Sequence, residues 1–173
     1  MRPFEEAAKY IGQKEKTANS GFQDPAFEKE MREEGWQAGW PWCQVFARLV
    51  YMNCYPEKAE EFKQLFSPST VKTFRNFRDA AYPIGYAPQL DAMVIWQTYK
   101  NGKPTPTGHA GIVCKVISSW EFESIEGNTS GSGSREGWIV GKHQRKVFAE
   151  VDNGLKVMGF VTISPPIHLT LNV

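Results

Sequence analysis

The sequence lacks a long apolar run, an excess of charge of either sign and a paired set of cysteines. Its 20 basic and 19 acidic side chains leave a formal net charge of +1, so no overall field draws the molecule to nucleic acid or to an anionic membrane. No apolar stretch approaches the roughly 20 residues of a membrane-spanning helix. We therefore expect no nucleic-acid partner and no membrane insertion.

The N-terminus and the cysteines bear on the compartment and on metal binding. The segment from Met1 to Glu6 becomes acidic where a secretory signal would carry an apolar stretch, so we expect synthesis in the cytoplasm without a Sec signal peptide. Cys43, Cys54 and Cys114 are odd in number, form no Cys-x-x-Cys pair and have few histidines nearby. The sequence predicts a free thiol, no zinc site and no cofactor, and the absence of any metal is expected from the family resemblance given below.

The length and the composition fit one domain. At 173 residues with 41% hydrophobic side chains, the chain can bury one sizeable core and is too short for two ordinary domains. The first half has helical periodicity, and the second half has the alternation and β-branched residues of strands, which is the pattern of an α+β domain. We expect one domain over 1–173, with a helical part over about 1–88 and a sheet part over about 89–165.

Start signals and periodicity predict the individual elements. Helices are predicted over 3–13, 24–34, 41–54, 56–66 and 69–80. Strands are predicted over 92–97, 109–117, 122–127, 138–147 and 157–163, which gives an antiparallel sheet of about five strands with the helices packed on it. The turn residues of 100–106 predict a loop, and the Gly/Ser-rich run at 129–134 predicts a flexible connection.

The most informative segment of the first half surrounds Cys43. Pro41 fits a first helical position, which puts Cys43 in the first turn, where unpaired backbone N–H groups and the helix dipole favour a thiolate. This context predicts a nucleophile. The alternative is a small buried hydrophobe, which is how we interpret Cys54 and Cys114, because neither lies at a helix start.

The candidate base opens the strand that runs from His109 to Val116. Alternation places His109 and Gly111 on one face and the apolar side chains on the other. Gly111 leaves room for another group to approach the imidazole closely. The alternative is a surface or core histidine with one satisfied hydrogen bond.

The next predicted strand ends with Glu126 and Asn128, which alternation projects from one face. If this strand pairs antiparallel with the histidine strand through a turn near Ser118 to Trp120, both side chains return to the level of His109. A polar acceptor on the imidazole fixes the tautomer that a general base needs. Glu126 is the better candidate for the direct partner, with Asn128 as an alternative or a supporting residue.

Other aromatic and histidine residues are weaker candidates for the site. Trp40 and Trp42 crowd the approach to Cys43 and are predicted to line a substrate groove, with Trp40 preferred, although large aromatics are more often core. His143 lies among basic residues on a strand face that we expect to be exposed, and His168 lies in the C-terminal tail. We assign neither histidine to the site.

These residues together resemble a known family, the CHAP amidase/peptidase domains of the NlpC/P60-like, papain-related group. The features run in order along most of the chain: Tyr10 to Glu15 with Asn19-Ser20-Gly21, Gly39-Trp40-Pro41-Trp42-Cys43, Gly108-His109-Ala110-Gly111-Ile112-Val113 and Ile125-Glu126-Gly127-Asn128-Thr129. The chain departs from the family at Leu90-Asp91, where members commonly have Gly-Asp, and it has no acidic calcium loop near Cys43.

The resemblance implies a papain-like fold and hydrolysis of peptidoglycan. Cys43, His109 and the Glu126/Asn128 pair would cut an amide bond between sugar and stem peptide or within the peptides. Gln37 stands where papain-like enzymes often place an oxyanion donor, although Gly39 and Pro41 leave its direction open. The implied partner of a monomeric enzyme is the cell wall, reached after release or non-Sec export, with an immunity protein if the protein is a toxin.

Two rival functions stay open at this level. The first is a cysteine hydrolase or transferase of the same fold that acts on another amide, and the second is a catalytically inactive binding module. The sequence does not separate a phage lysin, an interbacterial toxin and a housekeeping enzyme, nor an amidase from an endopeptidase.

Overall fold

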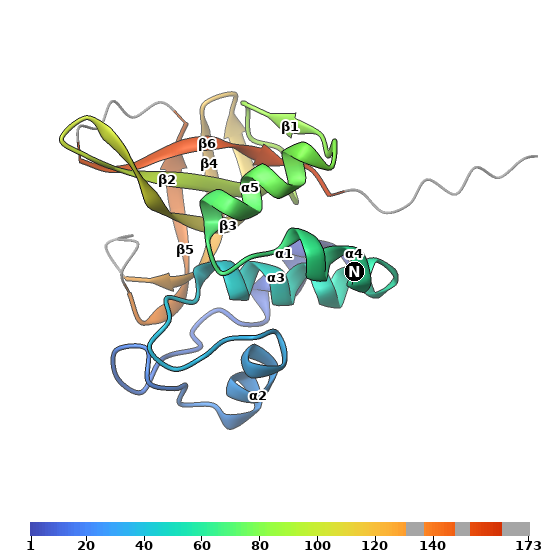
Figure 1. The fold of residues 1–173 in the computed structure, drawn as a ribbon, viewed down its shortest axis with the longest axis vertical. Helices are drawn as coiled ribbons and strands as arrows, with labels where there is room; N and C mark the ends of the chain where they lie inside the picture. Colours follow the sequence, from blue (N-terminus) through green and yellow to red (C-terminus); the bar gives the residue numbers. More distant parts are fainter. Residues whose placement is uncertain (131–136, 148–152, 164–173) are drawn as a thin grey trace, which may run out of the picture.

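The computed structural model describes residues 1–130, 137–147 and 153–163. Helices and one antiparallel sheet form an α+β architecture, as predicted (Figure 1). The helices are α1 (Pro3–Ala8), α2 (Pro25–Glu33), α3 (Cys43–Cys54), the 3-10 turn η1 (Pro56–Lys58), α4 (Ala59–Leu65) and α5 (Thr70–Asp79). The strands are β1 (Ile84–Gly85), β2 (Met93–Lys100), β3 (Lys103–Ser118), β4 (Glu121–Thr129), β5 (Ile139–Lys146) and β6 (Gly154–Val161).

The sheet has six strands in the order β1-β6-β2-β3-β4-β5, not about five. The additional strand, β1, is two residues long and pairs with β6 through Ile84 and Val161. A strand this short has no readable alternation, so the sequence pattern could not reveal it. It also moves the first strand of the sheet a few residues before the predicted boundary near residue 89.

The segment 100–106 is not a loop, which corrects the prediction from its turn residues. Asn101 and Gly102, with φ of 51° and 71°, form a two-residue turn, and β3 begins at Lys103. A turn with both central residues at positive φ matches the twist of the flanking strands. The prolines of the segment are tolerated because β4 pairs with β3 only from Ile112 onward, so this end of β3 has no neighbour in β4.

Two of the helices begin with a side-chain cap, and the helix bounds differ slightly from those predicted. The Asp24 side chain accepts a hydrogen bond from the Ala26 N–H, and the Ser69 hydroxyl accepts one from the Lys72 N–H at 3.3 Å. The first helix stops at Ala8, short of the predicted residue 13. Within the described part of the chain, no helix is long and apolar enough to cross a membrane.

The two faces of the sheet carry different clusters of buried side chains. On the helical face, α3 packs against β3 and β4, and Phe46 and Val50 join Ala110, Ile112 and Ile125 in the larger core. In Figure 1, α1, α3 and α4 lie together on this side and α5 runs alongside β2 and β6. A smaller cluster around Trp96, Val113, Phe122 and Phe160 occupies the other face. Alternation along β2 and β3 therefore divides the strands as the sequence predicts.

Candidate active site

Cys43 is the first residue of α3. Pro41 lies outside the helix, not at its first position as predicted, and Trp42 occupies the N-cap. Trp42 makes no side-chain cap, and the first turn contains no acidic residue, so backbone N–H groups at this end are left for another acceptor. Cys43 itself is 5% exposed. The helix start thus presents the thiol beside a set of N–H donors.

His109 lies on β3 with a carboxylate at its ring. Its Nε2 is 2.9 Å from Glu126 Oε2, and both side chains are fully buried. The β3–β4 pairing, with Ile112 opposite Ile125, brings Glu126 beside Gly111, two residues along β3 from His109 and on the same face. Gly111 makes the approach feasible, because a Cβ there would lie 2.8 Å from Glu126 Cγ. The contact that we favoured between Glu126 and the imidazole is present.

The Cys43 thiol lies on the remaining side of the imidazole. Burial by itself disfavours the imidazolium, but the charge and hydrogen bonding of Cys43, together with Glu126, raise the pKa of His109 to about 9. His109 Nδ1 has no hydrogen bond of standard geometry among the described residues. Since Nε2 is engaged by Glu126, Nδ1 is the ring nitrogen left for the thiol.

Glu126 is held by three neighbours. Arg145 donates from Nε to Oε1 at 2.8 Å and from Nη2 to Oε2 at 2.5 Å, and the Ser124 hydroxyl donates to Oε1 at 2.6 Å. Burial alone would raise the pKa of Glu126, but the hydrogen bonds and charges of Arg145 and His109 lower it to about 2. The partner of His109 is therefore a carboxylate at every pH at which the protein would work.

Sequence reasoning missed Arg145, which we grouped with His143 on an exposed strand face. The β4–β5 pairing places Arg145 opposite Phe122, and its guanidinium lies 5.5 Å from the centre of the Trp96 ring. The Trp96 ring in turn lies 5.6 Å from the His109 ring. Alternation along 142–146 puts His143 and Arg145 on one face, which is the only sequence signal that separates them from their exposed lysine neighbours.

Asn128 does not contact the imidazole in the way that Glu126 does. It is 1% exposed, and its amide atoms have no hydrogen-bond partner in the described part of the chain. Its φ of 55° and the shift of register between Glu126 and Thr129 break the alternation that we assumed. The alternation that we assumed along β4 therefore holds as far as Glu126 and is broken before Thr129, at Asn128.

The three residues proposed to bind substrate have different positions. Trp40 is 37% exposed and lines a cleft of about 290 Å³ together with Cys43. Trp42 is fully buried and its Nε1 donates to the Glu15 carboxylate, so the prediction that it lines the groove is wrong. Gln37 is exposed and is not among the residues of the cleft. The chain turns between Gln37 and Cys43: Gly39 has a φ of 90°, and the Trp40 N–H donates to the Gln37 carbonyl.

Trp42 is buried because the segment before Cys43 is tied to the aromatic core. Its ring packs on Phe22, Phe27 and Phe46, with ring centres 5.0, 6.2 and 6.5 Å away. The Glu15 carboxylate that receives its indole N–H also accepts the Asn19 N–H at 2.8 Å. These contacts fix Trp42, which occupies the N-cap position of α3. They therefore also fix the position of the Cys43 thiol that follows it.

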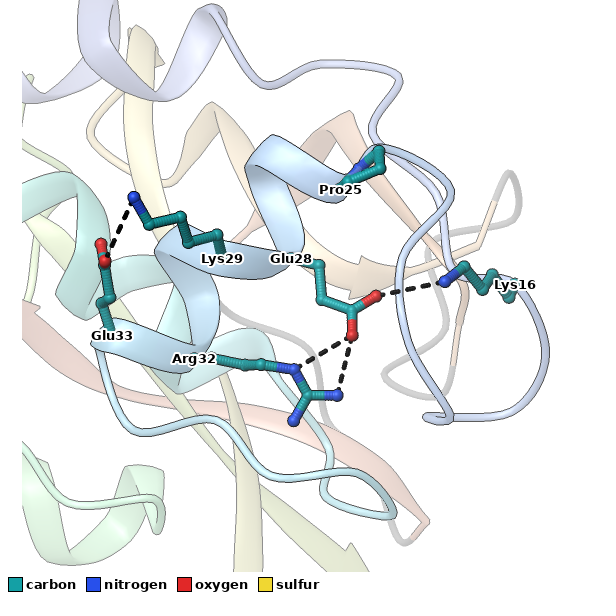
Figure 2. Close-up of a pocket in the computed structure, with 6 residues that line it drawn as sticks. All are labelled: Lys16, Pro25, Glu28, Lys29, Arg32 and Glu33. Atoms are coloured by element: carbon teal, nitrogen blue, oxygen red, sulfur yellow. Dashed lines mark hydrogen bonds and ion pairs between the residues drawn. The ribbon is translucent and has the colours of Figure 1, made fainter.

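Among the described residues, two larger hollows lie outside this cleft. One, of about 550 Å³, is lined by α2 residues and Lys16 (Figure 2), where Glu28 is paired with Lys16 and Arg32, and Lys29 with Glu33. The other, of about 620 Å³, lies between Glu15 and Trp138. Neither hollow contains a cysteine or a histidine, so neither repeats the chemistry of the cleft.

The other cysteines and histidines that the structure describes do not line the cleft that contains Cys43. Burial raises the pKa of the Cys54 and Cys114 thiols to about 11. His143 is half-buried rather than exposed, with Nε2 3.1 Å from Thr129 Oγ1, and burial lowers the pKa of its imidazole. His168 and most of the 129–134 segment lie outside the described residues.

The described residues contain no group of three or more His, Cys, Asp or Glu side chains placed to hold a metal ion. The cleft and its neighbours thus assemble four side chains from four elements: Cys43 at the start of α3, His109 on β3, Glu126 on β4 and Arg145 on β5. No family model, curated protein or solved structure matches this chain.

Proposed function

We propose that the protein is a cysteine-dependent hydrolase that cuts an amide bond of bacterial peptidoglycan. The observation that carries the proposal is the contact of His109 with a buried carboxylate at Nε2 and with the Cys43 thiol on its other side. A nucleophile, a base and a group that orients the base are the parts that acyl transfer needs. A papain-like fold belongs to the same proposal.

The mechanism follows from the contacts of the two reactive groups. The Cys43 thiolate attacks the amide carbonyl carbon, and the backbone N–H of Cys43, at the uncapped helix start, is placed to donate to the developing oxyanion. The C–N bond then breaks as the His109 imidazolium gives its proton to the leaving amine, which leaves a thioester on Cys43. Water, deprotonated by His109, hydrolyses the thioester and regenerates the thiolate.

Glu126 and Arg145 act on this cycle through His109. A permanent carboxylate at Nε2 holds the ring in one tautomer and stabilises the imidazolium that donates the proton. Arg145 keeps that carboxylate ionised and fixed by two hydrogen bonds. We describe Arg145 as a positioning residue, because its guanidinium contacts Glu126 and the Trp96 ring rather than the cleft.

The wall as substrate is supported by the resemblance to CHAP domains in the order and type of the Cys, Gly-His-x-Gly and Glu-x-Asn features. The cleft beside Cys43 is bordered by the partly exposed Trp40 and is lined by no Asp, Glu, Lys or Arg side chain. An amide between sugar and stem peptide or one within the peptides satisfies these conditions. Hydrolysis of another amide, or binding without catalysis, is what the experiment below has to exclude.

The experiment is digestion of purified sacculi of several peptidoglycan types by wild-type protein and by Cys43→Ala. We expect wild-type protein to release muropeptides whose masses identify the bond cut, and Cys43→Ala to release none while its circular dichroism and Tm stay close to wild type. Cys54→Ala is the matched control, because it removes a thiol from the other end of α3. Equal release by Cys43→Ala, or no release by wild type from any wall, contradicts the proposal.

A further inference from the structure

A second helix start borders the cleft. Thr70 is the first residue of α5, is 4% exposed, and lines the same cleft as Cys43. Its hydroxyl Oγ1 has no hydrogen-bond partner in the described part of the chain. Buried hydroxyl groups are almost always paired, and one that is not costs free energy. Thr70 therefore needs an explanation beyond the packing of α5.

The neighbouring strand is shaped to receive this hydroxyl. A Cβ at Gly108 would lie 2.5 Å from Thr70 Oγ1 and 2.1 Å from the Trp96 carbonyl oxygen, so only glycine allows the hydroxyl this close to β3. Gly108 directly precedes His109 on that strand. The Thr70 hydroxyl is thus held in the cleft wall next to the residue that carries the candidate base.

The other polar groups of the cleft already have partners. The Ser69 hydroxyl accepts the Lys72 N–H, and Thr107 Oγ1 lies 3.0 Å from Thr105 Oγ1. The rest of the cleft wall consists of Trp40, three prolines and Gly108, with no charged side chain. A rigid apolar cleft with one unpaired hydroxyl is arranged to orient an uncharged polar group of a ligand.

We propose that Thr70 binds substrate: its hydroxyl forms a hydrogen bond with a carbonyl or amide group of the substrate beside the bond that Cys43 attacks. This inference rests on the proposed function for the identity of the substrate. The hydrogen bond of Thr70 would form only when substrate binds. It would therefore favour a substrate that has a hydrogen-bonding group at that position over one that lacks it.

The test compares Thr70→Val, Thr70→Ser and Thr73→Val. Thr70→Val keeps the shape and removes the hydroxyl, and Thr70→Ser keeps the hydroxyl. Thr73→Val removes a buried hydroxyl of the same helix that lies outside the cleft and is paired with the Ser67 backbone. Three quantities are measured for each variant: the Tm, kcat and KM on a defined muropeptide, and the rate at which 4-nitrophenyl acetate acylates Cys43. The last reaction releases 4-nitrophenolate and leaves an acetyl thioester, so it needs the nucleophile but not the wall.

We expect Thr70→Val to keep or raise the Tm, because it removes an unpaired buried hydroxyl, and to lower kcat/KM on the muropeptide by about three- to tenfold. Thr70→Ser and Thr73→Val should stay within about twofold of wild-type kcat/KM, although Thr73→Val should lower the Tm because the Ser67 backbone loses its hydrogen-bond partner. A parallel fall in acylation by 4-nitrophenyl acetate would place the contact at the attacked carbonyl, and an unchanged acylation rate would place it further along the substrate.

Two results overturn the proposal. One is a fall in the Tm of Thr70→Val as large as that of Thr73→Val, which would show that the Thr70 hydroxyl has a structural partner. The other is unchanged kinetics of Thr70→Val on every substrate that the wild type turns over. If the wild type cuts no wall but is acylated by 4-nitrophenyl acetate, the proposed function fails and the acylation rates of the variants alone decide the role of Thr70.

Discussion

Replacing Glu126 by Gln should lower the stability of the protein as well as its kcat/KM, because the Glu126 carboxylate pairs with both the His109 imidazolium and the Arg145 guanidinium. The lowering of the Glu126 pKa from 4.5 to about 2 corresponds to about 3 kcal/mol at 1.36 kcal/mol per pKa unit. Breaking a buried ion pair typically costs about 3–5 kcal/mol. For a chain of this length, a loss of about 3 kcal/mol lowers the Tm by roughly 6–12 °C.

The pH at which stability should be measured follows from the lowered pKa of Glu126. Because the folded-state pKa of Glu126 lies below its unfolded value, its contribution is fully present above pH 4.5 and is lost as the pH falls toward 2. Thermal unfolding at pH 7 therefore reports the whole effect. Neutralising the partner as well, in Glu126→Gln/Arg145→Met, should restore part of the Tm, since no buried charge is then left alone.

The matched control is a surface ion pair between the same two strands, β4 and β5. Lys142 Nζ lies 3.1 Å from Glu123 Oε2, and the lysine side chain is 53% exposed. Glu123→Gln should change stability by less than about 1 kcal/mol. The reasoning is refuted if Glu126→Gln lowers the Tm no more than Glu123→Gln does, or if the losses of Glu126→Gln and Arg145→Met simply add in the double variant.

Four further outcomes are expected from the same geometry. Iodoacetamide should alkylate Cys43 before the other two thiols near neutral pH, because burial raises the pKa of those thiols to about 11; peptide mass mapping gives the order. The kcat/KM should fall as the pH rises through about 9, where the His109 imidazolium loses its proton, and this limb should move to lower pH in Glu126→Gln. Gly111→Ala, whose Cβ would lie 2.8 Å from Glu126 Cγ, should lower kcat/KM at least tenfold by displacing the carboxylate. Asn128→Ala should lower kcat/KM less than Glu126→Gln does, since the Asn128 amide makes no hydrogen bond to His109.

Each of these outcomes can fail separately. Faster alkylation of Cys54 or Cys114 would contradict the nucleophile assignment, and an alkaline limb that Glu126→Gln leaves in place would separate Glu126 from the titration of His109. Wild-type kcat/KM in Gly111→Ala would show that the carboxylate can move without loss. A larger loss in Asn128→Ala than in Glu126→Gln would make Asn128 the orienting residue.

The sequence predicted the elements that carry strong local signals. The helix starts near residues 24 and 69 follow from local residue types, and the alternation around His109 identified which face of β3 carries the imidazole. The antiparallel β3–β4 pairing could be predicted because a short turn joins the two strands, but the two shifts of register between that turn and Ile112 could not. The side of β4 that carries Glu126 could therefore be predicted, and its exact height along β3 could not.

Residues that depend on long-range packing could not be predicted in this way. Trp42 follows the same local pattern as Trp40. It is a core residue because its ring packs on Phe22 and Phe27 and its indole N–H donates to Glu15. Arg145 looks like its exposed neighbours until β5 pairs with β4. Thr70 carries no signal beyond its helix start, because its unpaired hydroxyl is a property of the assembled cleft.

The order of the site residues along the chain has a consequence for biosynthesis. The helix that carries Cys43 is made first, the strand with His109 later, and the strands with Glu126 and Arg145 last. A domain folds as a unit, so the thiol meets its base only after β3 is made, and the base meets a fixed carboxylate only after β5 has paired. A growing chain therefore carries the Cys43 thiol without these neighbours through most of its synthesis.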